Sequence, residues 1–271
     1  LYGIEVNPYA HELAQATIWI GYIQWLRANG FGAPPEPILK PIQTVRRMDA
    51  ILAYDAAGRP VEPAWPPADV IIGNPPFLGG KRLRSELGDV YVNKLFDLYG
   101  GRVPREADLV CYWFEKARTQ IEQGKAKRAG LLATQGIRGG ANRKVLERIK
   151  ASGDIFWAQS DRDWILDGAT VHVSMVGFDA GVETSRMLNG QAVTVINADL
   201  TATSDLTAAQ RLPENFGLSF MGVTPAGSFD VPESQAREWI ALPLNPNGRS
   251  NKDVLRPYFN GIDLTRRPRN V

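Results

Sequence analysis

Short apolar runs rich in β-branched residues alternate with longer helical stretches over residues 1–180. The runs predict strands at 2–6, 44–48, 69–72, 128–134, 155–159 and 170–178. Apolar residues at helical spacing predict helices at 8–28, 81–99 (broken at Gly88), 109–123 (capped by Asp108) and 142–151. Strands that alternate with helices predict an α/β fold with a mostly parallel sheet covered on both faces. Only the loop 160–169 joins the last two strands, so we expect them to pair antiparallel.

The residue composition of the chain changes near residue 181. Helical periodicity fades, and Pro, Asn, Gly and Ser accumulate in the remainder. We therefore predict one α/β domain over 1–180 and a second region over 181–271.

Composition excludes several classes of protein. The chain has 271 residues, of which 44% are hydrophobic and 22% charged, as in an ordinary globular protein. No apolar stretch is long enough to cross a membrane, and the single cysteine, Cys111, excludes a disulfide framework and indicates a reducing, cytoplasmic compartment. Two scattered histidines are too few for a zinc site, so we expect no metal. A net charge of +2 means that any nucleic-acid binding must use local basic patches.

The strand at 69–72 runs into Asn74-Pro75-Pro76-Phe77. The two prolines make the turn rigid and leave backbone carbonyls free to accept hydrogen bonds. Asn74 adds a side-chain carbonyl at the carboxyl end of the strand, where open α/β sheets place their ligands, and Phe77 adds a flat apolar face. This combination suits a planar ring that carries an exocyclic amine. The alternative is a Pro-rich turn with a core phenylalanine.

Glu5, Asp49 and then Asn74–Phe77 end successive predicted strands, an order that resembles the class I S-adenosylmethionine-dependent methyltransferases. The tetrapeptide resembles the fourth motif of the amino-methylating branch, in the Phe form typical of N6-adenine DNA methylation. Several further segments are similar to the MmeI-like (Type IIG/IIL restriction–modification) methyltransferases: 3–10, 19–21, 108–110, 128–134, 137–142 and 168–174. Residues 255–264 resemble the segment that opens the target-recognition region of such enzymes.

The resemblance implies a Rossmann-like fold and methyl transfer from S-adenosylmethionine to N6 of an adenine flipped out of double-stranded DNA. Asn74, Pro75, Pro76 and Phe77 match the catalytic turn, and Asn74 also adjoins the cofactor. Three further positions match cofactor contacts, each with a plain alternative. Glu5 would bind the ribose, or alternatively cap a helix. Asp49 would bind the adenine amine, or alternatively form a turn. Phe114 would line the cofactor pocket, or alternatively fill the core.

Five basic residues follow the predicted active-site strands, namely Lys81, Arg82, Arg84, Arg138 and Arg143. They would bind phosphates beside the flipped nucleotide, and a solvated basic rim is the alternative.

One motif of the family is absent from the sequence. The Gly-rich turn that cradles the methionine part of the cofactor should precede the strand that ends at Glu5. We therefore expect a sheet truncated at its N-terminus and a fragment that is inactive alone. The full-length chain would add a recognition domain and possible nuclease domain. An RNA or protein-amide methyltransferase and a non-catalytic DNA-binding fragment are the alternative functions.

Overall fold

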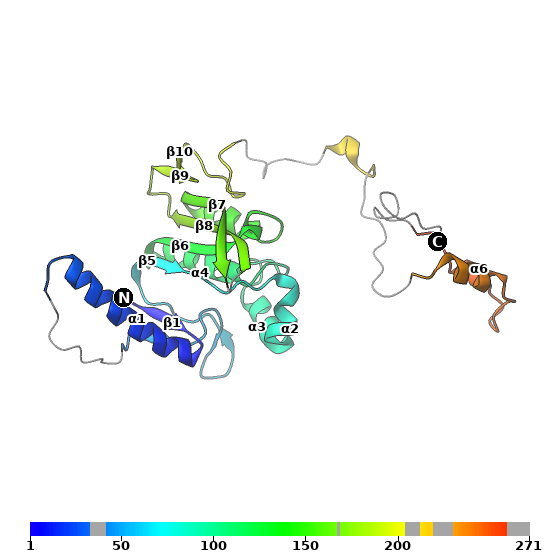
Figure 1. Ribbon diagram of the computed structural model, residues 1–271, viewed down its shortest axis with the longest axis horizontal. Coiled ribbons are helices and arrows are strands. Elements are labelled where there is room, and N and C mark those ends of the chain that lie inside the picture. The colour runs from blue at the N-terminus through cyan, green and yellow to red at the C-terminus, as the bar shows by residue number, and fades with distance from the viewer. Residues whose placement is uncertain (33–41, 167–168, 204–211, 219–229, 259–271) are drawn as a thin grey trace. The chain divides into compact units, whose positions relative to one another are not determined.

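The computed structural model describes residues 1–32, 42–166, 169–203, 212–218 and 230–258. The chain divides into two compact units, Leu1–Ala209 and Gln210–Val271. The first unit contains all the strands of the described residues (Figure 1). None of the helices in these ranges is long and apolar enough to span a membrane.

The main sheet has six strands in the order β10-β9-β7-β8-β6-β5 (Figure 1). Their bounds are β5 Ala68–Gly73, β6 Ala126–Thr134, β7 Asp154–Leu166, β8 Ala169–Asp179, β9 Arg186–Leu188 and β10 Gln191–Val193. β5 pairs with β6 and β7 with β9 in parallel, whereas the β6–β8, β7–β8 and β9–β10 pairs are antiparallel. The predicted antiparallel pairing of the last two strands is confirmed. The prediction of a mostly parallel sheet is wrong, because β8 turns back from β7 and inserts between β7 and β6.

A separate pair of parallel strands holds the N-terminal segment. It consists of β1 Gly3–Glu5 and β2 Val45–Arg47, with Glu5 opposite Arg47. In the sequence, α1 (Pro8–Ala28) lies between these two strands, and it starts at Pro8 as predicted. The Asn7 side chain caps it by accepting the backbone N–H groups of Tyr9 and Ala10. The predicted loop at 33–41 lies outside the described residues.

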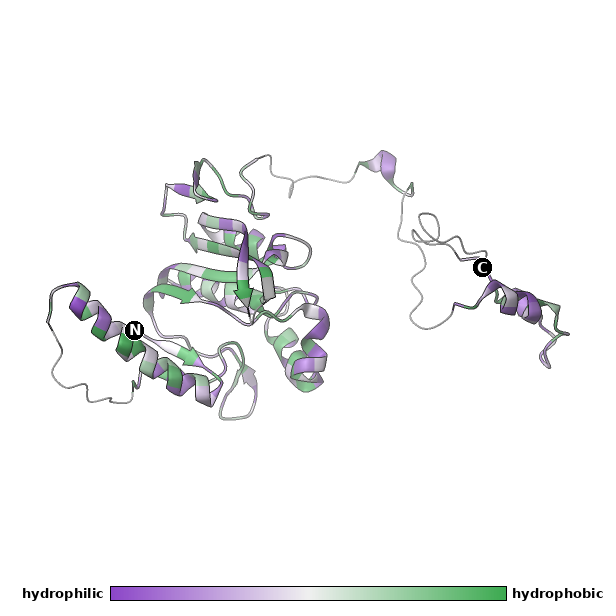
Figure 2. Cartoon of the chain, in the orientation of Figure 1, coloured by the Kyte–Doolittle hydropathy of each residue, from purple (hydrophilic) through white to green (hydrophobic). Residues whose placement is uncertain are grey.

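The helices after β5 form the core with the main sheet. Their bounds are α2 Leu83–Leu87, α3 Asp89–Leu98, α4 Val110–Glu122 and α5 Arg143–Ser152, with short 3₁₀ turns η1 Gly80–Arg82 and η2 Gln135–Arg138. The break between α2 and α3 falls at Gly88, as predicted, where φ is +80°. α4 packs against β6 and α5. Figure 2 shows the apolar colouring of the strands that this helix covers.

Three boundaries differ from the sequence prediction. Asp108 does not cap α4, since Leu109 occupies the N-cap position and makes no side-chain bond there. The region 54–67, predicted as turns, contains a short hairpin of β3 Ala53–Tyr54 and β4 Pro60–Val61. β7 continues past residue 159 into the predicted loop, because its pairing with β8 resumes at Arg162 after a bulge.

The sheet also continues past the predicted domain boundary near 181. β9 and β10 extend it, and the first compact unit runs to Ala209. Ile196 and Leu200 belong to the core of this unit, with 0% and 1% of their surfaces exposed. Composition alone missed this extension, because Pro- and Asn-rich loops can still insert single apolar side chains into a core.

A buried ion cluster joins α4 to α5. Glu115 on α4 is fully buried and accepts two hydrogen bonds each from Arg118 and Arg148, at 2.9 to 3.1 Å. Burial alone favours the neutral acid, but the hydrogen bonds from the two guanidinium groups hold the pKa of Glu115 below its usual value. The carboxylate is therefore ionised at neutral pH.

In the second unit, the described residues include α6, Glu233–Ala241, and the 3₁₀ turns η4 Pro213–Asn215 and η5 Asn251–Asp253. The side chain of Asn251 donates to the carbonyl of Trp239 at 2.9 Å and ties η5 to α6. The rest of the predicted recognition segment, from residue 259 onward, lies outside the described residues.

Candidate active site at the carboxyl edge of the sheet

The turn Asn74–Phe77 begins directly after the last residue of β5, as the sequence predicts. Asn74 and Pro76 are exposed, Pro75 is buried and Phe77 is half-buried. The turn therefore presents an accessible amide beside a partly covered aromatic ring at the carboxyl end of a strand. An amide oxygen can accept one N–H of a planar amine, and a carbonyl in such a turn can accept a second.

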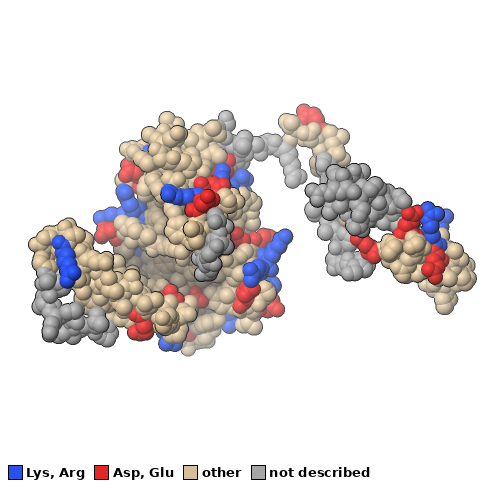
Figure 3. Space-filling view, viewed as in Figure 1, with Lys and Arg blue, Asp and Glu red and all other residues tan. Residues whose placement is uncertain are grey.

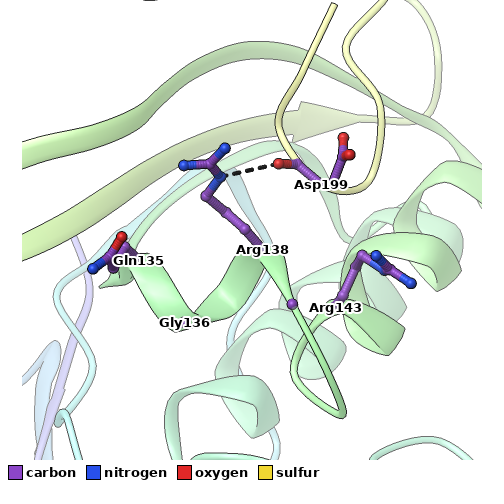
Figure 4. A pocket seen from close by; sticks show the side chains of 6 residues that line it. Gln135, Gly136, Arg138, Arg143 and Asp199 are labelled. Carbon is purple, nitrogen blue, oxygen red and sulfur yellow. Dashed lines mark hydrogen bonds between the residues drawn. The ribbon is translucent and has the colours of Figure 1, made fainter. Parts of the chain in front are cut away.

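The loop after β6 lies at the same edge, because β6 runs parallel to β5. It borders an open pocket of about 660 Å³ (Figure 4). The residues that line this pocket are Gln135, Gly136, Arg138, Gly139, Arg143 and Asp199. Arg138 and Arg143, two of the predicted DNA-binding residues, thus line the same pocket.

Each pocket arginine is held by one bond through Nε. Arg138 donates to the backbone carbonyl of Asp199 at 3.0 Å, the dashed line in Figure 4. Arg143 donates to Oε1 of Glu147 at 3.1 Å. The terminal nitrogens of Arg138 are left as a fork of donors beside the pocket, the geometry that suits a phosphate. Sequence reasoning missed Asp199, because its contact spans 61 residues and uses a backbone atom.

The other three predicted DNA-binding residues, Lys81, Arg82 and Arg84, are exposed on η1 and α2. Arg82 pairs with Glu86 and Arg84 with Asp89, both at 2.6 Å. None of the three is among the described residues that line the pocket. Figure 3 shows acidic and basic groups interspersed on the visible face. The solvated-rim alternative therefore stays open for these three residues.

Glu5 and Asp49 come together at the ends of the neighbouring strands β1 and β2. The N–H of Met48 donates to the carbonyl of Glu5 at 3.1 Å. Glu5 Oε1 accepts the N–H of Asn7 at 2.8 Å, and Asp49 Oδ1 accepts the N–H groups of Ile51 and Leu52 at 2.8 and 3.1 Å. Turn formation by Asp49 is thus present, whereas Asn7 and not Glu5 caps α1, and Glu5 binds only the N–H of that capping residue. An ionised carboxylate has about four acceptor sites, so both side chains retain capacity for a ligand.

Tyr91 binds one of the predicted cofactor carboxylates, a contact that sequence reasoning missed. Its hydroxyl donates to Asp49 Oδ2 at 2.7 Å, across 42 residues of sequence. Burial and the hydrogen bond to Asp49 raise the pKa of Tyr91, so the hydroxyl remains a donor at neutral pH. Tyr99, eight residues further on, donates to the carbonyl of Ile51 at 3.0 Å. The shared helical face of these two tyrosines is the one sequence signal that could have found the contact.

Phe114, predicted to line the cofactor pocket, is fully buried within α4. Its ring stacks on Phe178 with centroids 6.0 Å apart and an interplanar angle of 20°. This placement supports the alternative role as a core residue. Within the described ranges, no group of three or more His, Cys, Asp or Glu is placed to hold a metal ion.

The α/β fold with its mixed six-stranded sheet is consistent with the methyltransferase class. The family model described as "MmeI, DNA-methyltransferase domain" matches residues 1–189. The chain belongs to this family.

The solved structure of the Type IIL restriction–modification enzyme MmeI in complex with DNA is similar in fold, with a TM-score of 0.56 and 19% sequence identity. The match covers 75% of this chain and 29% of the MmeI chain. The chain thus corresponds to less than a third of that enzyme's length. No curated protein matches the sequence.

Proposed function

We propose that the chain is the catalytic part of a site-specific DNA methyltransferase in a restriction–modification enzyme. The reaction transfers a methyl group from S-adenosylmethionine to N6 of adenine. The exposed amide of Asn74 beside Phe77, at the end of β5 in a domain of the MmeI family, is the observation that carries this proposal.

The target base must leave the DNA stack to reach the turn, because its amine is held inside the duplex. Extrusion costs a few kcal/mol, and stacking on Phe77 offsets about 1–3 kcal/mol of that. Asn74 and the carbonyl of Pro75 accept the two amine hydrogens and orient the nitrogen lone pair toward the methyl donor. Positioning of this kind is the main catalytic contribution. The amine loses its proton as the new bond forms or afterwards, so no prior general base is required.

S-adenosylmethionine supplies an electrophilic methyl group on a sulfonium. The chemistry at the ends of β1 and β2 fits its nucleoside part, because Glu5 and Asp49 lie together and retain acceptor capacity. Glu5 accepts the ribose hydroxyls and Asp49 the adenine amine, with Tyr91 fixing the Asp49 carboxylate.

We also propose that a strand with the Gly-rich turn for the methionine part precedes Leu1 and lies between β1 and β5. Two observations support its position. Among the described strands, β5 pairs only with β6. Its residues Val70 and Ile72 are 48% and 85% exposed, which is unusual for apolar residues of a strand in an α/β sheet.

Arg138 and Arg143 bind phosphates next to the extruded nucleotide, supported by their shared pocket. Lys81, Arg82 and Arg84 contribute to the same electrostatic attraction from η1 and α2.

The test is methyl transfer by the full-length enzyme and its Asn74→Ala variant, with radiolabelled S-adenosylmethionine and duplex DNA. Asn74→Ala should lose at least about 100-fold in kcat while it retains specific DNA binding. Asn29→Ala, at the exposed end of α1, is the matched control and should behave like the parent. Near-normal transfer by Asn74→Ala would exclude this turn from catalysis. Labelling of RNA or protein but not of DNA would favour the alternative substrates, and no labelling at all would favour a non-catalytic role.

A further inference from the structure

We propose that Asp108 and Asn142 are a positioning pair that holds the catalytic turn against the loop carrying the pocket arginines. The inference rests on the proposed function, because it concerns how Asn74 and Phe77 are held for the reaction. Neither residue touches the turn itself, and both act through the backbone that they bind.

The two side chains make a reciprocal contact between α4 and α5. The side-chain nitrogen of Asn142 donates to Asp108 Oδ2 at 2.7 Å. The side-chain oxygen of Asn142 accepts the backbone N–H of Asp108, also at 2.7 Å. Asn142 uses both halves of its amide, so the contact requires one amide and one carboxylate in complementary orientation.

The pair extends to the segment that follows the catalytic turn. Asp108 Oδ1 accepts the backbone N–H of Gly80 at 2.8 Å. Next to it, the N–H of Leu109 donates to the carbonyl of Leu78 at 2.9 Å. The turn Asn74–Phe77 is therefore fixed at one end by β5 and at the other by the start of α4. Because α4 is embedded in the core, this second anchor is rigid.

At Gly80, the segment after the catalytic turn packs very closely against the backbone that precedes α4. A Cβ at Gly80 would lie 2.2 Å from the carbonyl oxygen of Glu106, which no real side chain tolerates. Gly80 is thus needed for close approach of two backbones rather than for a left-handed φ. Asp108 accepts the hydrogen bond from the Gly80 N–H at this point of close backbone contact.

The same pair reaches the pocket loop. The side-chain nitrogen of Asn142 also donates to the carbonyl of Gly136 at 3.3 Å, and Gly136 lines the pocket two residues before Arg138. The thiol of Cys111 donates to the side-chain oxygen of Asn142 at 3.5 Å, and burial raises the pKa of Cys111 and keeps it a thiol. Asp108 and Asn142 thus join three segments: the end of the catalytic turn, the start of α4 and the loop after β6.

The complementarity can be tested by exchanging the two side chains in the full-length enzyme. Asn142→Asp alone sets two carboxylates against each other, and Asp108→Asn alone sets two amides. The double variant Asp108→Asn/Asn142→Asp restores one amide and one carboxylate, and it loses only the bond to the Gly136 carbonyl. Gln123→Glu introduces the same change of an amide to an acid at the exposed C-terminal end of α4 and is the control.

We expect Asn142→Asp to lower kcat about 10- to 100-fold while DNA affinity and KM for DNA change less than about threefold. The kcat of the exchanged double variant should recover to within about fivefold of the parent value. The kcat of Gln123→Glu should equal that of the parent. Hydrogen–deuterium exchange of residues 74–80 should be faster in Asn142→Asp, because repulsion between the two carboxylates displaces the Asp108 side chain that accepts the Gly80 N–H. Exchange should return to near the parent rate in the double variant, where the side chains at 108 and 142 again bind each other.

The two readouts separate this inference from the proposed function. A parent enzyme that does not methylate adenine defeats the proposed function, and hydrogen exchange then decides whether the pair holds the turn. Unchanged exchange at 74–80 in Asn142→Asp overturns the inference. So does a folded double variant that is as slow as Asn142→Asp, or a loss of DNA binding equal to the loss of kcat.

Discussion

α1 and α4 differ more than any other two helices of the first unit, and the difference separates the two halves of the proposed site. α4 has 13 residues, ten of which are buried, among them the charged residues Glu115, Lys116 and Arg118. α1 has 21 residues and none is buried. It exposes Tyr9, Leu13, Ile20, Tyr22 and Trp25 by 49% to 77%.

The two helices mark the least and the most densely packed parts of the described first unit. The proposed catalytic turn and the pocket loop rest on α4 and α5, which are packed and joined by hydrogen bonds between polar groups. Glu5 and Asp49, the carboxylates that we propose to bind the cofactor, rest on a two-stranded sheet and a helix with little core of their own. The Asp49 loop joins this second half to the packed part, because Tyr91 binds Asp49, Tyr99 binds the carbonyl of Ile51, and Ile51 is itself buried in the core. Trp65 adds a hydrogen bond to the carbonyl of Ala50. Four predictions test this contrast.

The largest effect should come from the core of α4. Phe114→Ala removes a fully buried ring that stacks on Phe178 and should reduce the free energy of unfolding by about 3–5 kcal/mol. Trp25→Ala on α1 removes a ring of which 53% is exposed and should cost less than about 1 kcal/mol. Urea denaturation of both variants measures this. Equal losses would mean that α1 is as tightly packed as α4.

The second effect concerns the ion cluster of α4. Glu115→Gln removes the buried carboxylate that Arg118 and Arg148 share and should cost about 3 kcal/mol at pH 7. Glu122→Gln is the matched control, because Glu122 also pairs with Arg118 but is 53% exposed, and it should cost less than about 1 kcal/mol.

The pH dependence of this loss has a defined sign. The folded pKa of Glu115 is lower than its ordinary value of 4.5, so the stability that it contributes is present above pH 4.5. That stability is lost as the pH falls below 4.5 through the folded pKa. Unfolding of the parent and Glu115→Gln between pH 3 and 7 should therefore show a difference that shrinks toward low pH. A difference that is constant with pH would assign the loss to packing instead of charge.

The third effect belongs to the cofactor half. The 271-residue chain should bind S-adenosylmethionine weakly or not at all, and an N-terminally extended enzyme should bind it. In the extended enzyme, Glu5→Ala should weaken binding about tenfold by removing the acceptor for the ribose. Calorimetry measures both. Micromolar binding by the 271-residue chain, unaffected by Glu5→Ala, would contradict the assignment of this half.

The smallest effect tests the connection between the halves. Tyr91→Phe in the extended enzyme removes the donor to Asp49 Oδ2 and should weaken cofactor binding about fivefold, with little change in DNA affinity. Tyr54→Phe is the control, because the hydroxyl of Tyr54 accepts a hydrogen bond from Lys94 at 3.4 Å and makes none to Asp49 among the described residues. Equal binding by the parent and Tyr91→Phe would remove Tyr91 from the site.

Local patterns predicted most of the elements correctly. The start of α1 at Pro8 and the break at Gly88 depend on caps and on glycine, which act within a few residues. The position of Asn74–Phe77 at the end of β5 is equally local. The contacts of Asp108 are not local. Its sequence position predicts a helix cap, but its carboxylate binds residues 28 and 34 positions away.

The sequence by itself determined the strands and helices, the polar turn that ends β5 and the family to which the chain belongs, because each depends on residue types at short spacing. Tertiary structure alone decided that β8 lies between β6 and β7, that Phe114 faces the core, and that Tyr91 binds Asp49. It also decided that Arg138 and Arg143 share a pocket with Asp199. These arrangements arise when distant segments pack together, and their free energy comes from burial and from hydrogen bonds between residues that have no fixed spacing in the chain.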